Sequence, residues 1–238
     1  MSADLDALEH HVAGLGGWLT PKEGRLLYAL ARHCTGRGVI VEIGSWKGKS
    51  TIWLANGARD GAGGTVYAID PHTAQSDNLA TQSAVPTFAE FTQNIRAAGV
   101  SDLVVPLVMT SAEAARGFDR AVEMVFIDGA HDYESVALDL DLWFPKVVEG
   151  GIVAFHDTVA WEGPRRLVAE RLFRGSWARH ARFVDSITVA EKVSQNSRLD
   201  RARNRYTLAV KSLCDAGSRL NVPRPLRAGG RWLLERLT

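Results

Sequence analysis

A run of apolar residues interrupted by one acid leads directly into a glycine-containing turn near the start of this 238-residue chain. The run Val39–Ile43 has the composition of a buried strand, and Gly44 and Gly48 lie in the turn that follows. Three residues separate these glycines, one fewer than a P-loop needs, and no third glycine completes a dinucleotide-binding Gly-x-Gly-x-x-Gly motif. The pattern predicts a strand, a turn and a helix, with backbone that approaches a ligand closely.

Composition favours one large domain with a substantial core, because apolar residues make up 46% of the chain. No apolar run of about 18 residues predicts a transmembrane helix, and the acidic start of the chain is unlike a secretory signal. The two cysteines, Cys34 and Cys214, are far apart and lack metal-binding spacing. We therefore expect a reduced, cytoplasmic protein.

Charge is distributed unevenly along the chain, although the net charge is only +1. Residues 196–238 carry ten basic and three acidic side chains. Such a segment is typical of a solvated face, and it also suits contact with an anionic surface or a second subunit. The apolar residues 232–234 within it suit a homodimer contact, and without a nucleic-acid motif we expect no nucleic-acid partner.

Strand patterns alternate with helix patterns along most of the chain. Thr20 and Glu23 form a capping-box pattern around Pro21 at the start of one helix. The alternation predicts an α/β fold with a mostly parallel, doubly wound sheet covered by helices on both faces. We predict strands at 39–43, 65–70, 103–109, 124–128 and 151–156, helices at 5–15, 21–34, 50–58, 87–98, 112–117, 133–144 and 163–174, and a closing antiparallel hairpin from 181–190 and 205–210.

Three segments follow from this pattern. We predict an N-terminal helical segment at 1–36, one domain at 37–210 and a basic tail at 211–238. Within the domain, the polar stretch Thr73–Ala84 has the length and composition of a loop that covers a site.

Acidic residues stand at the ends of several predicted strands. Asp70, Asp128 and Asp157 each follow an apolar run, and Glu42 lies just inside the first one. The carboxyl ends of parallel strands meet at one edge of a sheet, which is where such sheets bind ligands. Asp70 is placed to accept the ribose hydroxyls of an adenosine, or alternatively to cap the turn that follows it.

A histidine accompanies two of these acids. Asp128 and Asp157 leave neighbouring strands, so their carboxylates can converge on one hard cation. His131 follows Asp128 by three residues, and an ordinary imidazole pKa suits proton abstraction at neutral pH. Ser111 and Ala112, after the third strand, suit contact with an adenine ring, although Ser111 suits a helix N-cap equally well.

Four motifs together resemble a known enzyme family: Val-Glu-Ile-Gly-Ser-Trp-x-Gly-x-Ser, Ile-Asp, Ile-Asp-Gly-x-His-x-Tyr and Gly-Gly-x-x-x-x-His-Asp. Over residues 39–158 the chain resembles the metal-dependent class I S-adenosylmethionine (SAM) O-methyltransferases, which include catechol O-methyltransferase. It looks closer to sugar O-methyltransferases of macrolide and methylated-polysaccharide pathways and to cephalosporin-hydroxylase-like enzymes. The resemblance implies a Rossmann-like, seven-stranded sheet and methyl transfer by direct displacement to a hydroxyl of a sugar, glycoside or oligosaccharide.

The resemblance also implies roles for individual residues. Asp70 would bind the ribose, Ser111 and Ala112 would flank the adenine, and Asp128 would also line the cofactor site. The methionine end of SAM would be held by Glu42, Gly44, Ser45, Trp46 and Ser50.

For the chemistry, the resemblance implies a Mg²⁺ ion on Asp128 and Asp157, with His131 as the general base. The family commonly has an acid where this chain has His156. His156 is therefore a candidate ligand, a group that supports a ligand, or a second base, and imidazole suits softer divalent metals better than Mg²⁺.

Other interpretations stay open at the level of the sequence. The acceptor could be a phenol, a catechol or an antibiotic intermediate, and the chain could be a non-catalytic SAM-binding subunit. A nicotinamide dehydrogenase or a P-loop hydrolase is disfavoured by the glycine spacing. Trp161, Phe173 and Trp177 are candidates for stacking on a sugar ring, or are core residues.

Overall fold

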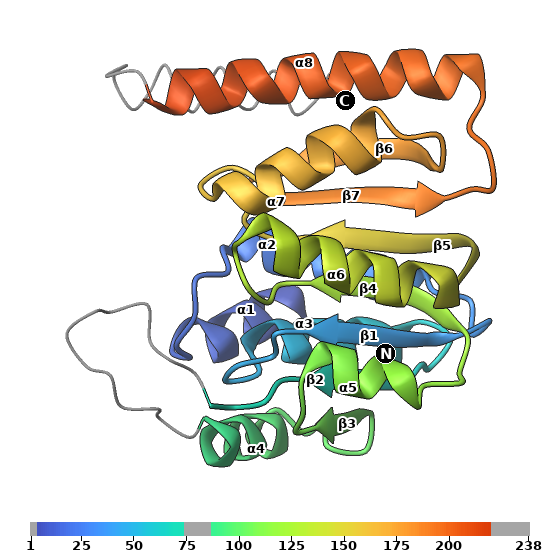
Figure 1. Ribbon diagram of the computed structural model, residues 1–238. Coiled ribbons are helices and arrows are strands. Elements are labelled where there is room, and N and C mark those ends of the chain that lie inside the picture. The colour runs from blue at the N-terminus through green and yellow to red at the C-terminus, as the bar shows by residue number, and fades with distance from the viewer. Residues whose placement is uncertain (1–3, 74–86, 220–238) are drawn as a thin grey trace.

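Five parallel strands lie at the centre of the computed structural model, which describes residues 4–73 and 87–219 (Figure 1). Two further strands extend one side of this sheet by antiparallel pairing, β7 with β5 and β6 with β7, giving the order β3-β2-β1-β4-β5-β7-β6. The strands are β1 (Val39–Ile43), β2 (Val66–Ile69), β3 (Val104–Leu107), β4 (Val122–Ile127), β5 (Val147–Phe155), β6 (Ala178–Val184) and β7 (Ile187–Lys192).

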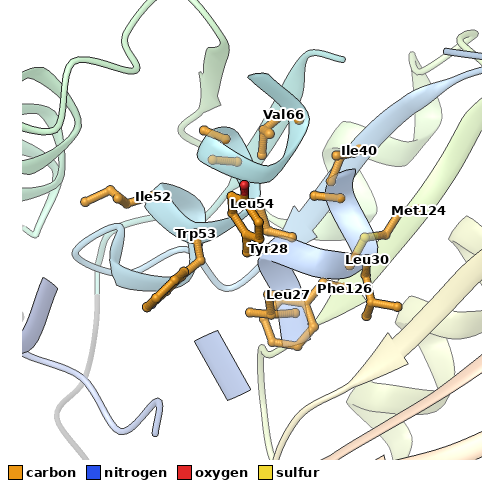
Figure 2. Close-up of a cluster of buried hydrophobic side chains, with 14 of the residues drawn as sticks. Leu27, Tyr28, Leu30, Ile40, Ile52, Trp53, Leu54, Val66, Met124 and Phe126 are labelled. Carbon is orange, nitrogen blue, oxygen red and sulfur yellow. The ribbon is translucent and has the colours of Figure 1, made fainter. Parts of the chain in front are cut away.

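Helices cover both faces of the sheet, and each face has its own buried apolar cluster. Helices α1 to α4 pack on one face, where Leu27, Trp53 and Phe126 belong to the same cluster (Figure 2). Helices α5 to α7 cover the other face. The helices are α1 (Leu5–Ala13), α2 (Pro21–His33), α3 (Lys49–Asp60), α4 (Phe88–Ala97), α5 (Ser111–Arg116), α6 (Tyr133–Trp143), α7 (Glu162–Leu167) and α8 (Arg198–Arg219), with a 3₁₀ turn at Phe144–Lys146 and a π-helical stretch at Val168–Phe173.

Helix α2, in the N-terminal segment, packs against the sheet and α3. It begins with the predicted capping box, in which Thr20 and Glu23 satisfy each other's backbone N–H groups. Gly24 and Gly57 let α2 and α3 approach closely, because a side chain at Gly24 would overlap the indole of Trp53 and one at Gly57 would overlap the carbonyl of Tyr28. The segment that we predicted at 1–36 therefore shares a hydrophobic core with the sheet.

The predicted parallel sheet with helices on both faces is confirmed, and so is the antiparallel C-terminal pair. The segments predicted for that pair are wrong, because 205–210 lies in α8 and 181–190 contains parts of both strands of the hairpin, β6 and β7. Asn204, Thr207 and Val210 are buried at helical spacing, and α8 packs along β6. Tertiary packing thus overrides the β propensity of this stretch.

Two further findings concern the predicted loop and the membrane. Most of the Thr73–Ala84 loop lies outside the described residues. Within the described helices, none combines the length and the apolar character that crossing a bilayer requires.

The carboxyl edge of the sheet is held tightly at Gly44, which has a φ of +88°. The amide of Asp128 donates to the carbonyl of Ile43, and a Cβ at Gly44 would overlap the carbonyl oxygen of Asp128. The end of β1 therefore lies against the end of β4, where the strand order reverses.

We expect Gly44→Ala to lower the free energy of unfolding by roughly 3 kcal/mol or more, because it adds a backbone clash to a left-handed conformation. Gly63→Ala is a matched control, since Gly63 also has a positive φ but no atom within 4 Å of the added Cβ. It should cost only about 1 kcal/mol. Urea denaturation measures both, and equal losses would contradict the close approach of β1 and β4.

Candidate active site

The turn after β1 is fixed by contacts with the neighbouring strand end. Trp46 has a positive φ of 40°, and its amide donates to Asp70 Oδ2 at 2.8 Å. Asp70 Oδ1 accepts from the amide of His72 at 2.6 Å, so each carboxylate oxygen already accepts a hydrogen bond from a backbone amide. Gly48, with a φ of +85°, is the N-cap of α3 and lies against Phe91. The turn is thus shaped by contacts within the protein itself.

Polar atoms without partners are buried beside this turn. Glu42 is fully buried, and Thr51 donates to its Oε2, but its Oε1 has no hydrogen-bond partner among the described residues. The hydroxyl oxygen of Ser45 is likewise buried without a partner in that part of the chain. Buried polar groups are normally hydrogen-bonded, so these atoms fit the polar end of a bound ligand such as SAM. Burial raises the pKa of Glu42 to about 8.

The predicted adenine-side residues lie at the start of α5. Thr110 caps this helix through a capping box with Glu113, so the alternative that Ser111 is the N-cap is wrong. The Ser111 hydroxyl instead accepts from the Trp143 indole at 2.8 Å, which ties α5 to α6. Ser111 and Ala112 are half-buried.

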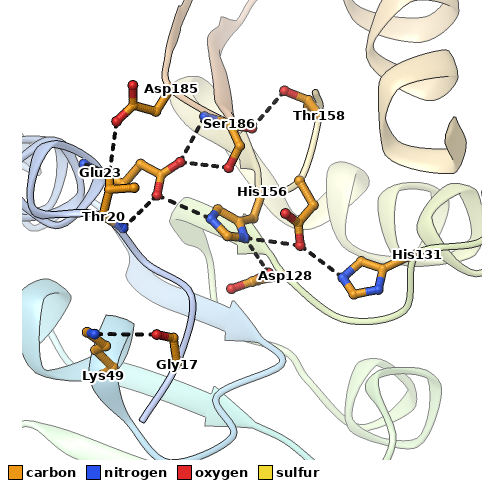
Figure 3. A network of polar contacts seen from close by, with 11 residues as sticks. Gly17, Thr20, Glu23, Lys49, Asp128, His131, His156, Thr158, Asp185 and Ser186 are labelled. Carbon is orange, nitrogen blue, oxygen red and sulfur yellow. Dashed lines mark hydrogen bonds and ion pairs between the residues drawn. The ribbon is translucent and has the colours of Figure 1, made fainter. Parts of the chain in front are cut away.

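A cluster of acids and histidines occupies the ends of β4 and β5 (Figure 3). One side-chain ligand atom from each of Asp128, His156 and Asp157 lies within 4.8 Å of the others. His156 Nδ1 is 2.9 Å from Asp128 Oδ1 and 3.4 Å from Asp157 Oδ2. Asp157 itself has a positive φ of 57°, a strained conformation that turns its carboxylate toward the cluster.

This donor set fits a divalent cation. Two carboxylates and an imidazole are common metal ligands, and the mixture with nitrogen favours Mn²⁺, Co²⁺ or Zn²⁺ over Mg²⁺. Neither nitrogen of His156 makes a well-aligned hydrogen bond within the described residues, although the side chain is 5% exposed. Burial alone would lower the pKa of His156, but the carboxylates of Asp128, Asp157 and Glu23 raise it to about 12. The cluster therefore requires a positive centre.

His131 joins the cluster from the loop that precedes α6. Its Nε2 lies 2.9 Å from Asp157 Oδ2, and its ring stacks on Trp161 with centroids 4.2 Å apart. Burial would raise the pKa of Asp157, but the contacts with His131 and His156 hold it well below its usual range. Asp157 is therefore ionised and orients both rings.

Sequence reasoning missed one member of this network. Glu23 was predicted only as part of a capping box, yet its buried carboxylate also accepts from Ser186 and lies 3.5 Å from His156 Nε2. Burial would raise the pKa of Glu23, but the nearby ring of His156 and the hydrogen bonds from Ser186 lower it to about 2. The only available signal was the capping-box pattern, which gives no hint of a contact with β5.

A second contact missing from the sequence interpretation involves the segment between α1 and α2. Lys49, the first residue of α3, donates to the carbonyls of Leu15 and Gly17 at 3.3 and 3.4 Å. Trp18, with 82% of its surface exposed, stacks on Trp46 at a centroid distance of 5.1 Å. The N-terminal segment therefore lies over the glycine turn.

Comparison with known proteins agrees with this geometry. Residues 41–158 match a family described as a methyltransferase domain. The fold is shared with an O-methyltransferase, TomG of Streptomyces achromogenes, which is involved in tomaymycin synthesis and was solved with SAM; identity is 20%, the TM-score is 0.56, and 80% of this chain and 88% of that chain are covered.

Two other solved structures have the same fold. The O-methyltransferase NovP is 20% identical with a TM-score of 0.62, over 74% of this chain and 83% of that one. An O-methyltransferase from Bacillus cereus, solved with SAH, is 20% identical with a TM-score of 0.53, over 79% and 90%. The chain therefore has the Rossmann-like fold of the class I methyltransferases. Residues 41–158 carry the sequence of a methyltransferase domain.

We expect the stability of the protein to fall as pH rises from about 5 to 8, because unfolded Glu42 ionises near 4.5 whereas folded Glu42 stays protonated up to about 8. Glu42→Gln mimics the neutral acid. It should raise the free energy of unfolding by roughly 1–3 kcal/mol at pH 8 and change it little at pH 4.

Urea denaturation across this pH range measures the difference. Glu113→Gln is the control, because Glu113 is an exposed carboxylate in a capping box and should show no gain at pH 8. If Glu42→Gln left the pH profile of the wild type unchanged, Glu42 would have to be ionised in the folded protein.

Proposed function

We propose that this chain is a SAM-dependent O-methyltransferase that uses a divalent cation and His131 to activate a hydroxyl of a sugar or glycoside. The observation that carries the proposal is the position of the Asp128, His156 and Asp157 cluster. It lies with His131 at the same sheet edge as a glycine turn with unpartnered buried polar atoms.

The cofactor part of the proposal concerns the ends of β1 and β2. SAM supplies an electrophilic methyl group. Glu42 and Ser45 would receive its methionine end, because Glu42 Oε1 and Ser45 Oγ are buried and lack partners among the described residues. Asp70 would bind the ribose, since each of its oxygens accepts one backbone N–H and keeps a second lone pair. The fold shared with SAM- and SAH-bound O-methyltransferases supports this arrangement.

The cation part concerns the ends of β4 and β5. A divalent cation supplies Lewis acidity that lowers the pKa of a bound hydroxyl. Asp128, His156 and Asp157 would hold it, because their ligand atoms already lie within 4.8 Å of one another. The imidazole favours a softer ion than Mg²⁺.

The proton acceptor would be His131. Asp157 faces Nε2 at 2.9 Å, which orients the imidazole that would receive the proton. The ionised Asp157 then stabilises the imidazolium that forms. Trp161 stacks on the face of the ring, so His131 has little freedom to turn away.

The acceptor would bind beside Trp161. Trp161 is 42% exposed and lies against His131, so its indole offers a flat apolar surface at the site. The other two aromatic candidates are less suited, because Phe173 is buried in the core and Trp177 packs on Phe144. A sugar or a phenol would both stack on Trp161, and an acceptor screen distinguishes them. A homodimer, a cytoplasmic location and the three-segment division stay predictions from the sequence.

We expect His131→Ala to lower kcat by roughly 10²–10⁴-fold while the Kd for SAM changes little, because His131 acts on the acceptor proton rather than on the cofactor. His180→Ala is a matched control, since it removes an exposed histidine that pairs with Glu191 outside the cluster. Turnover assays and calorimetric titration with SAM measure the two effects. Wild-type turnover in the His131→Ala variant would remove the base assignment.

We also expect EDTA to abolish activity and Mn²⁺ or Co²⁺ to restore it at lower concentration than Mg²⁺, because one ligand is an imidazole. Asp157→Asn removes one candidate ligand, so it should weaken metal binding and leave SAM binding intact. Full activity in metal-free buffer would mean that His156, in its charged form, serves as the positive centre of the cluster without a metal.

A further inference from the structure

Glu23 is a buried carboxylate that the methyl-transfer proposal does not use. It lies in α2, outside the matched residues 41–158, and is 1% exposed. Its Oε1 accepts from the amide and the hydroxyl of Ser186 at 2.8 and 2.6 Å. Its Oε2 accepts from the amide of Thr20 at 2.8 Å. These three donors fix the carboxylate in one orientation.

The fixed carboxylate faces the ring of His156 (Figure 3). Glu23 Oε2 lies 3.5 Å from His156 Nε2, and among the described residues no other carboxylate pairs with that nitrogen. The opposite nitrogen, Nδ1, faces Asp128 and Asp157 at 2.9 and 3.4 Å. The ring thus has one side toward α2 and one side toward the candidate cation site.

We propose that Glu23 is a positioning residue that keeps the proton of His156 on Nε2 and turns Nδ1 toward the cation. The proposal rests on the cation site of the proposed function. A histidine ligand commonly donates its second N–H to a carboxylate, which fixes the tautomer and the ring orientation. Here the carboxylate comes from an N-terminal helix that the methyltransferase domain does not include, so α2 is part of the site.

The test variant Glu23→Gln keeps the shape of the side chain and replaces one acceptor oxygen by an NH₂ donor. Two donors of Ser186 face Oε1, so the amide oxygen takes that place and the amide NH₂ faces His156, while the Thr20 amide loses its acceptor. The NH₂ group then donates to Nε2, which moves the ring proton to Nδ1. A protonated Nδ1 has no lone pair for the cation. The variant should therefore weaken metal binding although all the ligand side chains are still present.

Co²⁺ is the probe, because calorimetry gives its Kd and its visible spectrum reports a nitrogen ligand. With full-length protein and no SAM, we expect Glu23→Gln to weaken Co²⁺ binding by roughly 10–100-fold and to change the spectrum. Thr20→Ala is the matched control. It removes the hydroxyl cap of α2 but keeps the Thr20 amide and the Glu23 carboxylate, so it should lower the Tm and leave the Co²⁺ Kd within about threefold.

A double-mutant cycle separates positioning from a general structural role. In a His156→Ala background, Glu23→Gln should have no further effect on Co²⁺ binding. Equal losses of Co²⁺ affinity in Glu23→Gln and Thr20→Ala would overturn the proposal, because both would then act through the stability of α2. If Glu23→Gln does not fold, Ser186→Ala replaces it: this variant removes one donor to Oε1 and should weaken Co²⁺ binding by a smaller factor, and an unchanged Kd would overturn the proposal.

The remaining outcomes distinguish this inference from the proposed function. If wild type and Glu23→Gln bind Co²⁺ equally well while Asp157→Asn does not bind it, the cation site stands and the positioning role of Glu23 is wrong. If wild type does not bind Co²⁺ at all, the cation site fails, and the inference fails with it.

Discussion

Three carboxylates converge on the buried ring of His156, and the rest of the sheet edge depends on this arrangement. Asp128 and Asp157 face one nitrogen and Glu23 faces the other. A buried ion without compensation costs several kcal/mol, so a positive centre must stand among these acids. Either the charged imidazole or a divalent cation meets that need. Because the acids come from β4, β5 and α2, the three elements must keep their relative positions for the cluster to be stable.

Under the proposal for Glu23, this requirement gives helix α2 a chemical as well as a structural role. The start of α2 lies over the turn between β6 and β7, where Thr20 donates to Asp185 and Ser186 donates to Glu23. The preceding segment lies over the glycine turn through Trp18 and Lys49. The matched domain at 41–158 contains the strand ends, but the elements that hold them in place come from both sides of it in the sequence.

Local patterns predicted the parallel part of the sheet because each strand carries its own apolar run, and a glycine or an acid follows within two residues of every one of them except β3. They also predicted the cluster of Asp128, His131 and Asp157, since the carboxyl ends of neighbouring parallel strands must meet. Glu23 could not be found in this way, because its partner Ser186 is 163 residues away and no local rule links them. The same reason explains the error at 205–210, where burial against β6 decides the structure.

Acids on the two sides of the sheet edge have opposite pKa shifts because their surroundings differ, and they are therefore suited to different chemistry. Glu42 has hydroxyl neighbours and no cation beside it among the described residues, so burial raises its pKa to about 8. Asp157 faces two imidazoles, which keep it ionised. A buried acid without a counter-charge gains stability in its ionised form when a cationic group binds, and under the proposed function the ammonium group of SAM would be that cation. An acid already paired with histidine is instead suited to orienting a base. Under the proposed function, environment alone, with the same carboxyl chemistry, would separate a cofactor side from a proton-transfer side.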